Sequence, residues 1–252
     1  MKQEAIIREI FNSIQGEGIY LGVRQVFIRF QGCPLRCSYC DSSETWNYEL
    51  ESCRVEKTPG ARDFYNVKNP LNVQQLMRIV EKLWLPSTKH LSLTGGEPLL
   101  YARYIAELGY RFDKKLYLET SSALPAQAEE IKDCIDIASC DIKLREHGNF
   151  DDYDQLLKDE LETLKIFHKA KVDLFAKIVV LEETTTSSLS PAIEGIARIS
   201  KRIPLVLQPV SPTEKLKTKP TPIKLLELME FAGKKLLDVR VIPQAHKIMG
   251  FL

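Results

Sequence analysis

The feature that most constrains the fold of this chain is a regular alternation of apolar, strand-like runs with segments of helical periodicity, from residue 72 almost to the C-terminus. Because a strand, a helix and another strand form a βαβ unit with a right-handed crossover, this repetition predicts a parallel sheet covered by helices. Together with an apolar run at residues 26–30, the pattern contains about seven strands. The expected fold class is therefore α/β, short of a closed eight-stranded barrel.

The expected elements follow from apolar spacing and from capping residues. Strands are predicted at residues 5–14, 26–30, 89–93, 115–119, 135–140, 172–181, 203–210 and 237–242. Helices are predicted at residues 72–84, 98–108, 125–132, 153–169, 191–199 and 221–233. Gly109 is expected to end the second of these helices. Residues 47–70 are polar, contain two prolines and a glycine, and show no clear period, so an irregular insertion is expected there.

The composition is that of a soluble globular protein. The chain of 252 residues is 44% hydrophobic and 27% charged, and it is long enough to bury a sizeable core as one domain. With 35 basic and 34 acidic side chains, the net charge of +1 creates no broad positive field, so we expect no nucleic-acid partner. The N-terminus has no signal-peptide pattern and no run approaches the roughly 18 apolar residues of a membrane span, so we expect a cytoplasmic protein without a membrane partner.

Three cysteines lie within eight residues, at Cys33, Cys37 and Cys40, with the spacing C-x3-C-x2-C. Thiolates on a short loop are soft ligands suited to iron–sulfur clusters or zinc, and a complete structural site normally uses four of them. Three ligands indicate a cubane of four irons in which one iron is free to bind another molecule. The alternative is a zinc site completed by the distant Cys53.

Polar residues and glycines follow the predicted strands. In a parallel α/β sheet, functional residues gather at the carboxyl ends of the strands, so these segments are expected to form a binding ring at one edge. The run at residues 26–30 leads directly into the cysteine loop. The polar segments after the later strands begin at Thr94, Glu119, Asp141, Gln208 and Gln244.

Two features inside these segments are candidates for ligand contact. Arg29 lies within an apolar run, where burying a cation requires an anionic partner, although strand alternation also permits an exposed position. The pair Gly95-Gly96 would let the backbone approach a ligand closely, although an ordinary strand-to-helix turn also uses glycine. Both patterns favour a site at the strand ends without identifying its ligand.

The cysteine loop, with Tyr39 directly before its last cysteine, resembles the cluster loop of the radical S-adenosylmethionine (SAM) enzymes. Its flanks, FNSIQGEG at residues 11–18 and Cys40-Asp41-Ser42 with Trp46, resemble those of the 7-carboxy-7-deazaguanine synthases within that superfamily. The resemblance runs from about Glu9 to the C-terminus. It implies a single radical SAM domain over residues 1–252, folded as an open, partial parallel β/α barrel of six to seven strands.

The resemblance also implies a set of site residues and three cofactors, a 4Fe–4S cluster, SAM and Mg²⁺. The cluster ligands and catalytic residues would be Cys33, Cys37 and Cys40 with Arg29. The SAM-binding residues would be Tyr39, Gly95, Gly96, Glu97, Glu119, Asp141, Ile142, Lys143, Gln208, Pro209, Val210 and Ser211. The substrate-binding residues would be Ile14, Gln15, Gly16, Glu17, Arg29, Thr94, His246 and Leu252. The Mg²⁺ ligand would be Ser42, at a position where many members of the family have threonine.

The implied activity is that of a carbon–nitrogen lyase, which converts 6-carboxy-5,6,7,8-tetrahydropterin to 7-carboxy-7-deazaguanine with loss of ammonia, in queuosine and deazapurine biosynthesis. A 5′-deoxyadenosyl radical derived from SAM would remove hydrogen from C6 of the pterin. The implied partners are a low-potential electron donor of the flavodoxin or ferredoxin type and a second copy in a homodimer. Two alternatives stay open at this point: an activase of glycyl-radical enzymes from the same superfamily, and a zinc-binding module.

Overall fold

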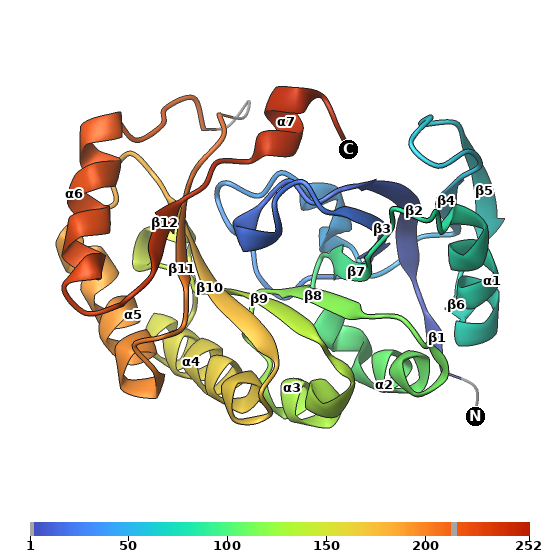
Figure 1. Cartoon of the computed structure of the whole chain (residues 1–252), viewed down its shortest axis with the longest axis horizontal. Helices are drawn as coiled ribbons and strands as arrows, with labels where there is room; N and C mark the ends of the chain where they lie inside the picture. The colour runs from blue at the N-terminus through green and yellow to red at the C-terminus, as the bar shows by residue number, and fades with distance from the viewer. Residues whose placement is uncertain (1–2, 213–215) are drawn as a thin grey trace.

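A single ten-stranded sheet forms the centre of the molecule, and its helices pack on the outer face (Figure 1). The computed structural model describes residues 3–212 and 216–252. Seven neighbouring strands are parallel, which confirms the predicted α/β class and the open, partial barrel. In sheet order they are β3 (Arg24–Phe30), β7 (His90–Gly95), β8 (Leu116–Thr120), β9 (Ile137–Asp141), β10 (Asp173–Val180), β11 (Leu205–Pro209) and β12 (Val239–Val241).

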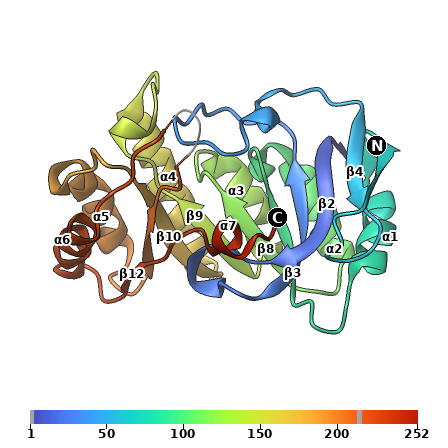
Figure 2. The same cartoon turned by 90° about the horizontal axis from the view of Figure 1, so that it is seen from above.

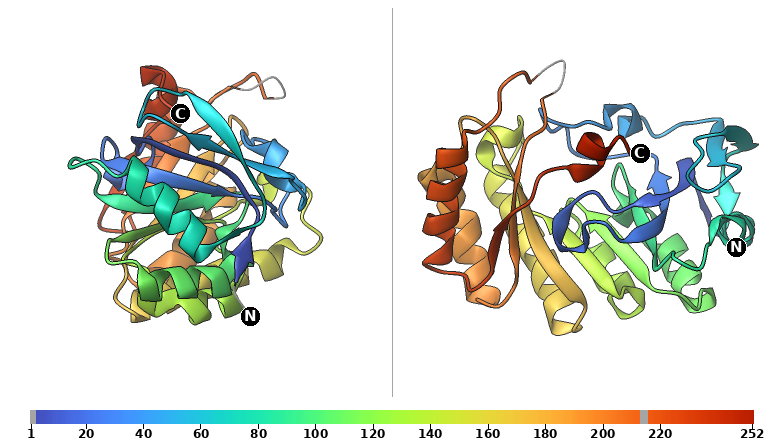
Figure 3. Two further views of the ribbon diagram at one scale, coloured as in Figure 1. Left: turned by 90° about the vertical axis from the view of Figure 1, so that its right-hand side faces the viewer. Right: turned by 45° about the horizontal axis from the view of Figure 1, so that its top comes forward.

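Helices lie along the outside of this curved sheet, as the rotated views in Figure 3 show. They are α1 (Val73–Leu83), α2 (Ala102–Arg111), α3 (Pro125–Ile131), α4 (Tyr153–Lys169), α5 (Thr186–Ile199) and α6 (Pro222–Gly233). Two of the helix starts are capped as the sequence suggests: Asn72 and Gln75 form a reciprocal capping box before α1, and the Thr221 side chain accepts from the N–H of Lys224 before α6.

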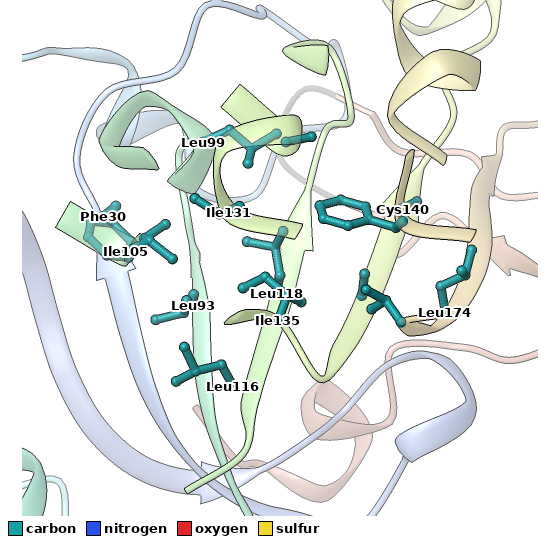
Figure 4. Close-up of a cluster of buried hydrophobic side chains, with 14 of the residues drawn as sticks. Phe30, Leu93, Leu99, Ile105, Leu116, Leu118, Ile131, Ile135, Cys140 and Leu174 are labelled. Carbon is teal, nitrogen blue, oxygen red and sulfur yellow. The ribbon is translucent and has the colours of Figure 1, made fainter. Parts of the chain in front are cut away.

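The main core lies between the sheet and these helices. Along β8, Leu116 and Leu118 point outward into it, whereas Tyr117 and Glu119 point to the inner face. Figure 4 shows part of this core. Its labelled side chains are Phe30, Leu93, Leu99, Ile105, Leu116, Leu118, Ile131, Ile135, Cys140 and Leu174.

The inner face is closed near the amino ends of the parallel strands by a second apolar cluster. Tyr117 and Phe175 belong to it, and Ile19 and Tyr20 of the short turn η1 (Gly18–Tyr20) pack against it. The Tyr20 hydroxyl also donates to Asp173 at the start of β10. The inner face is therefore filled at this end by the apolar cluster, together with the buried His90, which stacks on Tyr117.

Three further strands extend the sheet beyond β3: β2 (Ile7–Ile14), β4 (Ser52–Glu56) and β5 (Phe64–Lys68). The last two form an antiparallel hairpin, so the prediction of an irregular insertion at residues 47–70 is wrong for these ten residues. Cys53 and Val55 of β4 are buried against the core, while every second residue is polar. Two short strands, β1 (Glu4–Ala5) and β6 (Leu71–Asn72), pair separately.

Two predicted helix boundaries are also wrong. The helix expected at residues 98–108 begins as the 3-10 turn η3 (Pro98–Tyr101), and α2 continues through Gly109, which packs closely against Cys134. Helix α5 begins five residues before Pro191, because the Thr185 side chain accepts from the N–H of Ser188 and starts the helix within a hydroxyl-rich run. In the described part of the chain, no helix combines the length and apolarity needed to cross a membrane.

We expect Asn12→Ala to lower the free energy of unfolding by about 1–3 kcal/mol, because Asn12 is a buried polar link between β2 and the end of α1. Its Nδ2 donates to the carbonyl of Leu83 at 2.9 Å and to Thr88 Oγ1 at 3.0 Å, and alanine leaves both without this partner. Urea unfolding measures the change. The matched control is Asn66→Ala on the exposed face of β5, expected to stay within about 0.5 kcal/mol. An equal decrease in the free energy of unfolding in the two variants would contradict the role of Asn12 as a buried link.

Candidate active site

A cavity of about 220 Å³ opens at the carboxyl ends of the parallel strands. The loops after β3, β7, β8, β9 and β11 contribute to its wall, as the sequence predicted for a parallel sheet. The short helix α7 (Ala245–Met249) and the chain that follows it lie over this end of the sheet (Figure 2). The strand ends thus meet at one place, although they are far apart in sequence.

Most of the predicted site residues line this one cavity. They are Ile14, Gln15, Gly16, Glu17, Arg29, Cys33, Cys37, Tyr39, Cys40, Ser42, Thr94, Gly95, Gly96, Glu119, Asp141, Lys143, Gln208, Val210, Ser211, His246 and Leu252. Three predicted SAM contacts lie outside the lining: Glu97, Ile142 and Pro209. Ile142 is a core residue, and Pro209 is half-buried at the end of β11.

The carboxylate of Glu97 is used within the protein. It is completely buried, and it accepts from the N–H of Leu99, from the Thr120 hydroxyl, and from both the N–H and the hydroxyl of Ser121, at 2.5 to 2.9 Å. This side chain therefore fastens the loop after β7 to the loop after β8. The carboxylate is thus used inside the protein, and the expected contact of SAM with the backbone around Gly95 and Glu97 stays a prediction.

The cysteine loop is held in place mainly by backbone contacts. Ser38 N–H donates to the carbonyl of His147 at 2.8 Å, and Arg36 Nη1 donates to the carbonyl of Cys33 at 2.5 Å. The ring of Tyr39 meets the His147 ring edge to face, with 4.9 Å between centroids. The loop consequently has a defined shape with its three thiols in the cavity wall.

The three thiols fit an iron–sulfur cluster better than a zinc ion. Burial raises the pKa of Cys33 to about 12 and also raises that of Cys37, so these thiols would ionise only when a metal takes the place of the proton. Cys53 is buried in β4, where its Sγ contacts the carbonyl of Arg54, and it does not line the cavity. The four-ligand zinc alternative therefore lacks its fourth ligand.

Two cavity residues have buried polar atoms without a partner in the described part of the protein. These atoms are Oη of Tyr39 and Oε1 of Gln208. A buried acceptor without a donor costs free energy, so such a group in a cavity wall indicates a bound polar ligand. Gly96 lies close by, and a Cβ there would meet the carbonyl oxygen of Gly32 at 1.9 Å. These features fit a ligand such as SAM, which has hydroxyl, amino and carboxylate groups.

A network of buried charges lies on the side of the cavity formed by β9 and β10. Lys143 Nζ is 2.8 Å from Asp141 Oδ2, and Lys177 Nζ is 3.2 Å from Asp141 Oδ1 and 2.5 Å from Glu17 Oε2. Burial opposes the ionisation of Asp141, but Lys143 and Lys177 outweigh it and hold the pKa of Asp141 below its ordinary value. The carboxylate is therefore ionised.

Predicted substrate residues meet around Glu119. Gln15 Nε2 donates to Glu119 Oε1 at 2.7 Å, and Thr94 Oγ1 donates to Glu119 Oε2 at 2.9 Å. Burial, reinforced by Glu17, raises the pKa of Glu119. Although the sequence places Glu119 with the SAM contacts, its hydrogen bonds join it to two residues of the predicted substrate set.

Arg29 is largely buried and has an anionic partner, as expected for a cation within an apolar run. Its Nε donates to Glu9 Oε1 at 2.8 Å, and its guanidinium also lines the cavity. Burial lowers the pKa of Arg29, but Glu9, with smaller effects from Asp41 and Glu119, raises it overall, so the side chain is a permanent cation. A negatively charged ligand group in this cavity would meet it.

The C-terminal segment covers the cavity and is fastened there by polar contacts. Gln244 Nε2 donates to Glu17 Oε1 at 2.7 Å, and Lys247 Nζ lies 2.6 Å from Asp41 Oδ2. The carbonyl of Leu252 accepts from the Ser13 hydroxyl at 3.3 Å. Polar contacts therefore hold the tail at the cavity, while the side chains of Ile248, Met249 and Phe251 are exposed.

The predicted site set omitted five charged or polar residues of the lining: Asp41, Thr120, Ser121, Lys177 and Gln244. Lys177 lies in the apolar run of β10, which is the same signal that singled out Arg29. Gln244 was recognised as a strand-end residue without being given a role. Asp41 was recognised as part of the Cys40-Asp41-Ser42 motif without being given a role.

Residues 27–194 match the family model of the radical SAM superfamily. A similar fold occurs in the crystal structure of QueE from Escherichia coli, with a TM-score of 0.61 at 20% identity over 96% of this chain and 95% of that one. Streptococcus suis SuiB bound to S-adenosylmethionine gives a TM-score of 0.53 at 14% identity, over 84% of this chain and 48% of that one. The fold, the cysteine loop and this match define a member of the radical SAM superfamily, whose enzymes use a 4Fe–4S cluster and SAM.

The similarity of whole chains narrows the assignment. A 7-carboxy-7-deazaguanine synthase of Methanocaldococcus jannaschii is 39% identical over 98% of this chain and 100% of its own length. One of Geobacter sulfurreducens is 39% identical over 100% of this chain and 99% of its own length. The chain belongs to the 7-carboxy-7-deazaguanine synthase family. The resemblance seen in the sequence is thus confirmed, and neither the activase nor the zinc alternative is favoured.

We expect Cys37→Ala to abolish the brown colour and the iron content of anaerobically reconstituted protein, because two thiolates cannot hold a cubane securely. Cys53→Ala is the matched control: the same substitution in a buried cysteine outside the cavity should leave the iron content unchanged. Iron analysis and the absorption spectrum measure both. Full iron content in Cys37→Ala, or loss of iron in Cys53→Ala, would overturn the ligand assignment.

Proposed function

We propose that this chain converts 6-carboxy-5,6,7,8-tetrahydropterin to 7-carboxy-7-deazaguanine with loss of ammonia, as a Mg²⁺-dependent carbon–nitrogen lyase of queuosine and deazapurine biosynthesis. The observation that carries the proposal is the meeting of two residue sets in one cavity: the three cysteines and the residues around Glu119 and Arg29. Full-length similarity to proteins named for this activity supports it.

The residues around the cysteine loop would hold the cluster and SAM. When bound, these two groups supply the electron and the organic radical that remove one hydrogen atom from the substrate. Cys33, Cys37 and Cys40 would hold three of the irons. Gln208 and Lys143 offer an acceptor and a cation to the polar groups of SAM, and α7 with the following tail excludes water from the covered cavity.

The other side of the cavity suits a carboxylated pterin. Glu119 presents carboxylate oxygens to a ring edge that has N–H donors, and Gln15 and Thr94 fix its orientation. Arg29 supplies a permanent positive charge for the carboxylate of the substrate. We assign Glu119 to this side because of these hydrogen bonds.

Ser42 is the residue of the lining that we propose as a Mg²⁺ ligand. Mg²⁺ takes hard oxygen ligands and keeps waters or substrate oxygens in its shell, so one hydroxyl together with a substrate carboxylate is a reasonable set. Ser42 is half-buried beside the last cysteine, where its Oγ lies 4.0 Å from Cys40 Sγ. A metal there would bring the substrate carboxylate close to the cluster loop.

We further propose that the protein works in the cytoplasm as a homodimer and receives electrons from a low-potential donor of the flavodoxin or ferredoxin type. The need for a low-potential electron favours such a donor. Sedimentation velocity and reconstituted electron transfer test these two points separately.

Ser42→Ala should weaken the magnesium dependence of turnover, whereas Ser42→Thr should preserve activity because it keeps the hydroxyl. Pterin turnover measured against Mg²⁺ concentration compares the two variants with the wild type. Formation of 5′-deoxyadenosine without substrate serves as the control, since SAM cleavage should be unaffected. A wild-type magnesium response in Ser42→Ala would show that the metal binds elsewhere.

Arg29→Ala should raise the KM for the pterin by a factor on the order of 10 to 100, as expected from the loss of roughly 1.5–3 kcal/mol for a hydrogen bond to a charged group. Steady-state kinetics measure it. Arg54→Ala is the matched control, because Arg54 also pairs with Glu9, at 3.7 Å, but is more exposed and lies outside the cavity. An unchanged KM in Arg29→Ala, or an equal rise in Arg54→Ala, would contradict the proposed contact.

A further inference from the structure

Lys177 is a buried cation in the middle of an apolar strand. Its side chain is 9% exposed, and its neighbours in β10, Ala176 and Ile178, are completely buried. Burying an ammonium group is expensive unless anionic partners offset the loss of hydration. A lysine at this position therefore needs contacts that compensate for the lost hydration of its ammonium group. These contacts indicate its role in the site.

The ammonium group of Lys177 joins two carboxylates from distant segments. Its Nζ lies 2.5 Å from Glu17 Oε2, in the loop after β2, and 3.2 Å from Asp141 Oδ1, at the end of β9. Each carboxylate has a second, separate partner: Gln244 Nε2 donates to Glu17 Oε1 at 2.7 Å, and Lys143 Nζ lies 2.8 Å from Asp141 Oδ2. The two ion pairs of Lys177 can therefore be removed independently.

These two carboxylates belong to different halves of the cavity. Glu17 lies next in the chain to Gln15 and Gly16 of the substrate side, and Asp141 is paired with Lys143 of the SAM side. Among the residues that the structure describes, Lys177 is the cation that has ion pairs on both sides. Its position is at the boundary between the two ligands.

The charge of Lys177 is fixed. Burial lowers the pKa of its ammonium group, but Asp141, Glu17 and Glu119 together raise the pKa far above the ordinary value for lysine. A group that keeps its proton this strongly is a poor proton donor near neutral pH. The role open to it is electrostatic and geometric.

We propose that Lys177 is a positioning residue that serves both ligands through two separable ion pairs, holding Glu17 in place for the pterin and Asp141 in place for SAM. The inference rests on the proposed function, because it assigns one ligand to each half of the cavity. The inference gives the two ion pairs separate roles: loss of the Lys177–Glu17 pair affects pterin binding, and loss of the Lys177–Asp141 pair affects SAM binding.

Two double-mutant cycles test this division. Lys177→Met, which keeps the length of the side chain without its charge, is combined with Glu17→Gln in one cycle and with Asp141→Asn in the other. Calorimetry on cluster-loaded protein under anaerobic conditions measures the Kd of SAM without pterin and the Kd of the pterin without SAM. Neither titration depends on turnover.

We expect Lys177→Met to raise the Kd of SAM and the Kd of the pterin, each on the order of tenfold. Glu17→Gln should raise the Kd of the pterin and leave the Kd of SAM unchanged. The double variant Lys177→Met/Glu17→Gln should bind the pterin about as weakly as either single variant. For SAM binding, this cycle should show no coupling between the two substitutions. Asp141→Asn should show the reverse: coupling to Lys177→Met for SAM and none for the pterin. Lys165→Met, which breaks an exposed pair with Glu162 on α4, is the matched control and should change neither Kd.

A merely structural role gives a different pattern. If Lys177→Met loosens the whole site, both cycles show similar coupling for both ligands, and the inference is wrong. Additive effects in both cycles also overturn it. If Lys177→Met does not fold, Lys177→Gln replaces it in the same cycles. Wild-type protein that binds SAM but not the pterin would refute the proposed function itself, together with this inference; binding of both ligands with additive cycles would refute the inference alone.

Discussion

The site depends on how closely the ends of β3 and β7 approach each other. Glu97 N–H donates to the carbonyl of Gly32 at 2.8 Å, and Gly96 N–H donates to the carbonyl of Phe30 at 3.0 Å. Gly95 has a φ of +123°, and a Cβ there would lie 2.4 Å from the backbone of Phe30. Any side chain at Gly95 would therefore force the end of β3, which leads into the cysteine loop, away from the Gly95-Gly96 segment. The parallel ladder sets this distance before any ligand is present.

The same strands provide both the hydrophobic core and the chemistry, because successive side chains point to opposite faces. The inner face can consequently hold charges only if they compensate one another. Asp141, Lys143, Lys177 and Glu17 do so as a connected set, and Arg29 does so with Glu9. The apolar cluster around Tyr117 and Phe175 keeps water from the other end of the inner face. The cavity and its charged lining lie at the carboxyl ends of the strands.

The sequence predicted the parallel sheet well because fully buried strands and capped helices have strong local patterns. The sequence did not predict the hairpin β4–β5, because its short strands alternate polar residues with few apolar ones. The position of this hairpin is decided by pairing with the neighbouring β2. Most of the motif residues line one cavity, since strand ends must meet at one edge of a parallel sheet. Side-chain contacts could not be predicted, because the direction of the Glu97 side chain and the carboxylates that Lys177 joins depend on packing between separate segments. Glu17 and Lys177, for example, are 160 residues apart.

The segment from Gln15 to Tyr20 differs from an ordinary connecting loop in where it runs. Gln15 and Glu17 face the cavity, and Ile19 and Tyr20 reach the apolar cluster at the amino ends of the strands. Gly18 separates the two parts with a φ of +66°, and a Cβ there would meet the ring of Phe175 at 2.4 Å. Loops on a protein surface generally tolerate changes of length during evolution. This one passes through the interior with both ends fixed by packing, so its length is as constrained as that of a core strand.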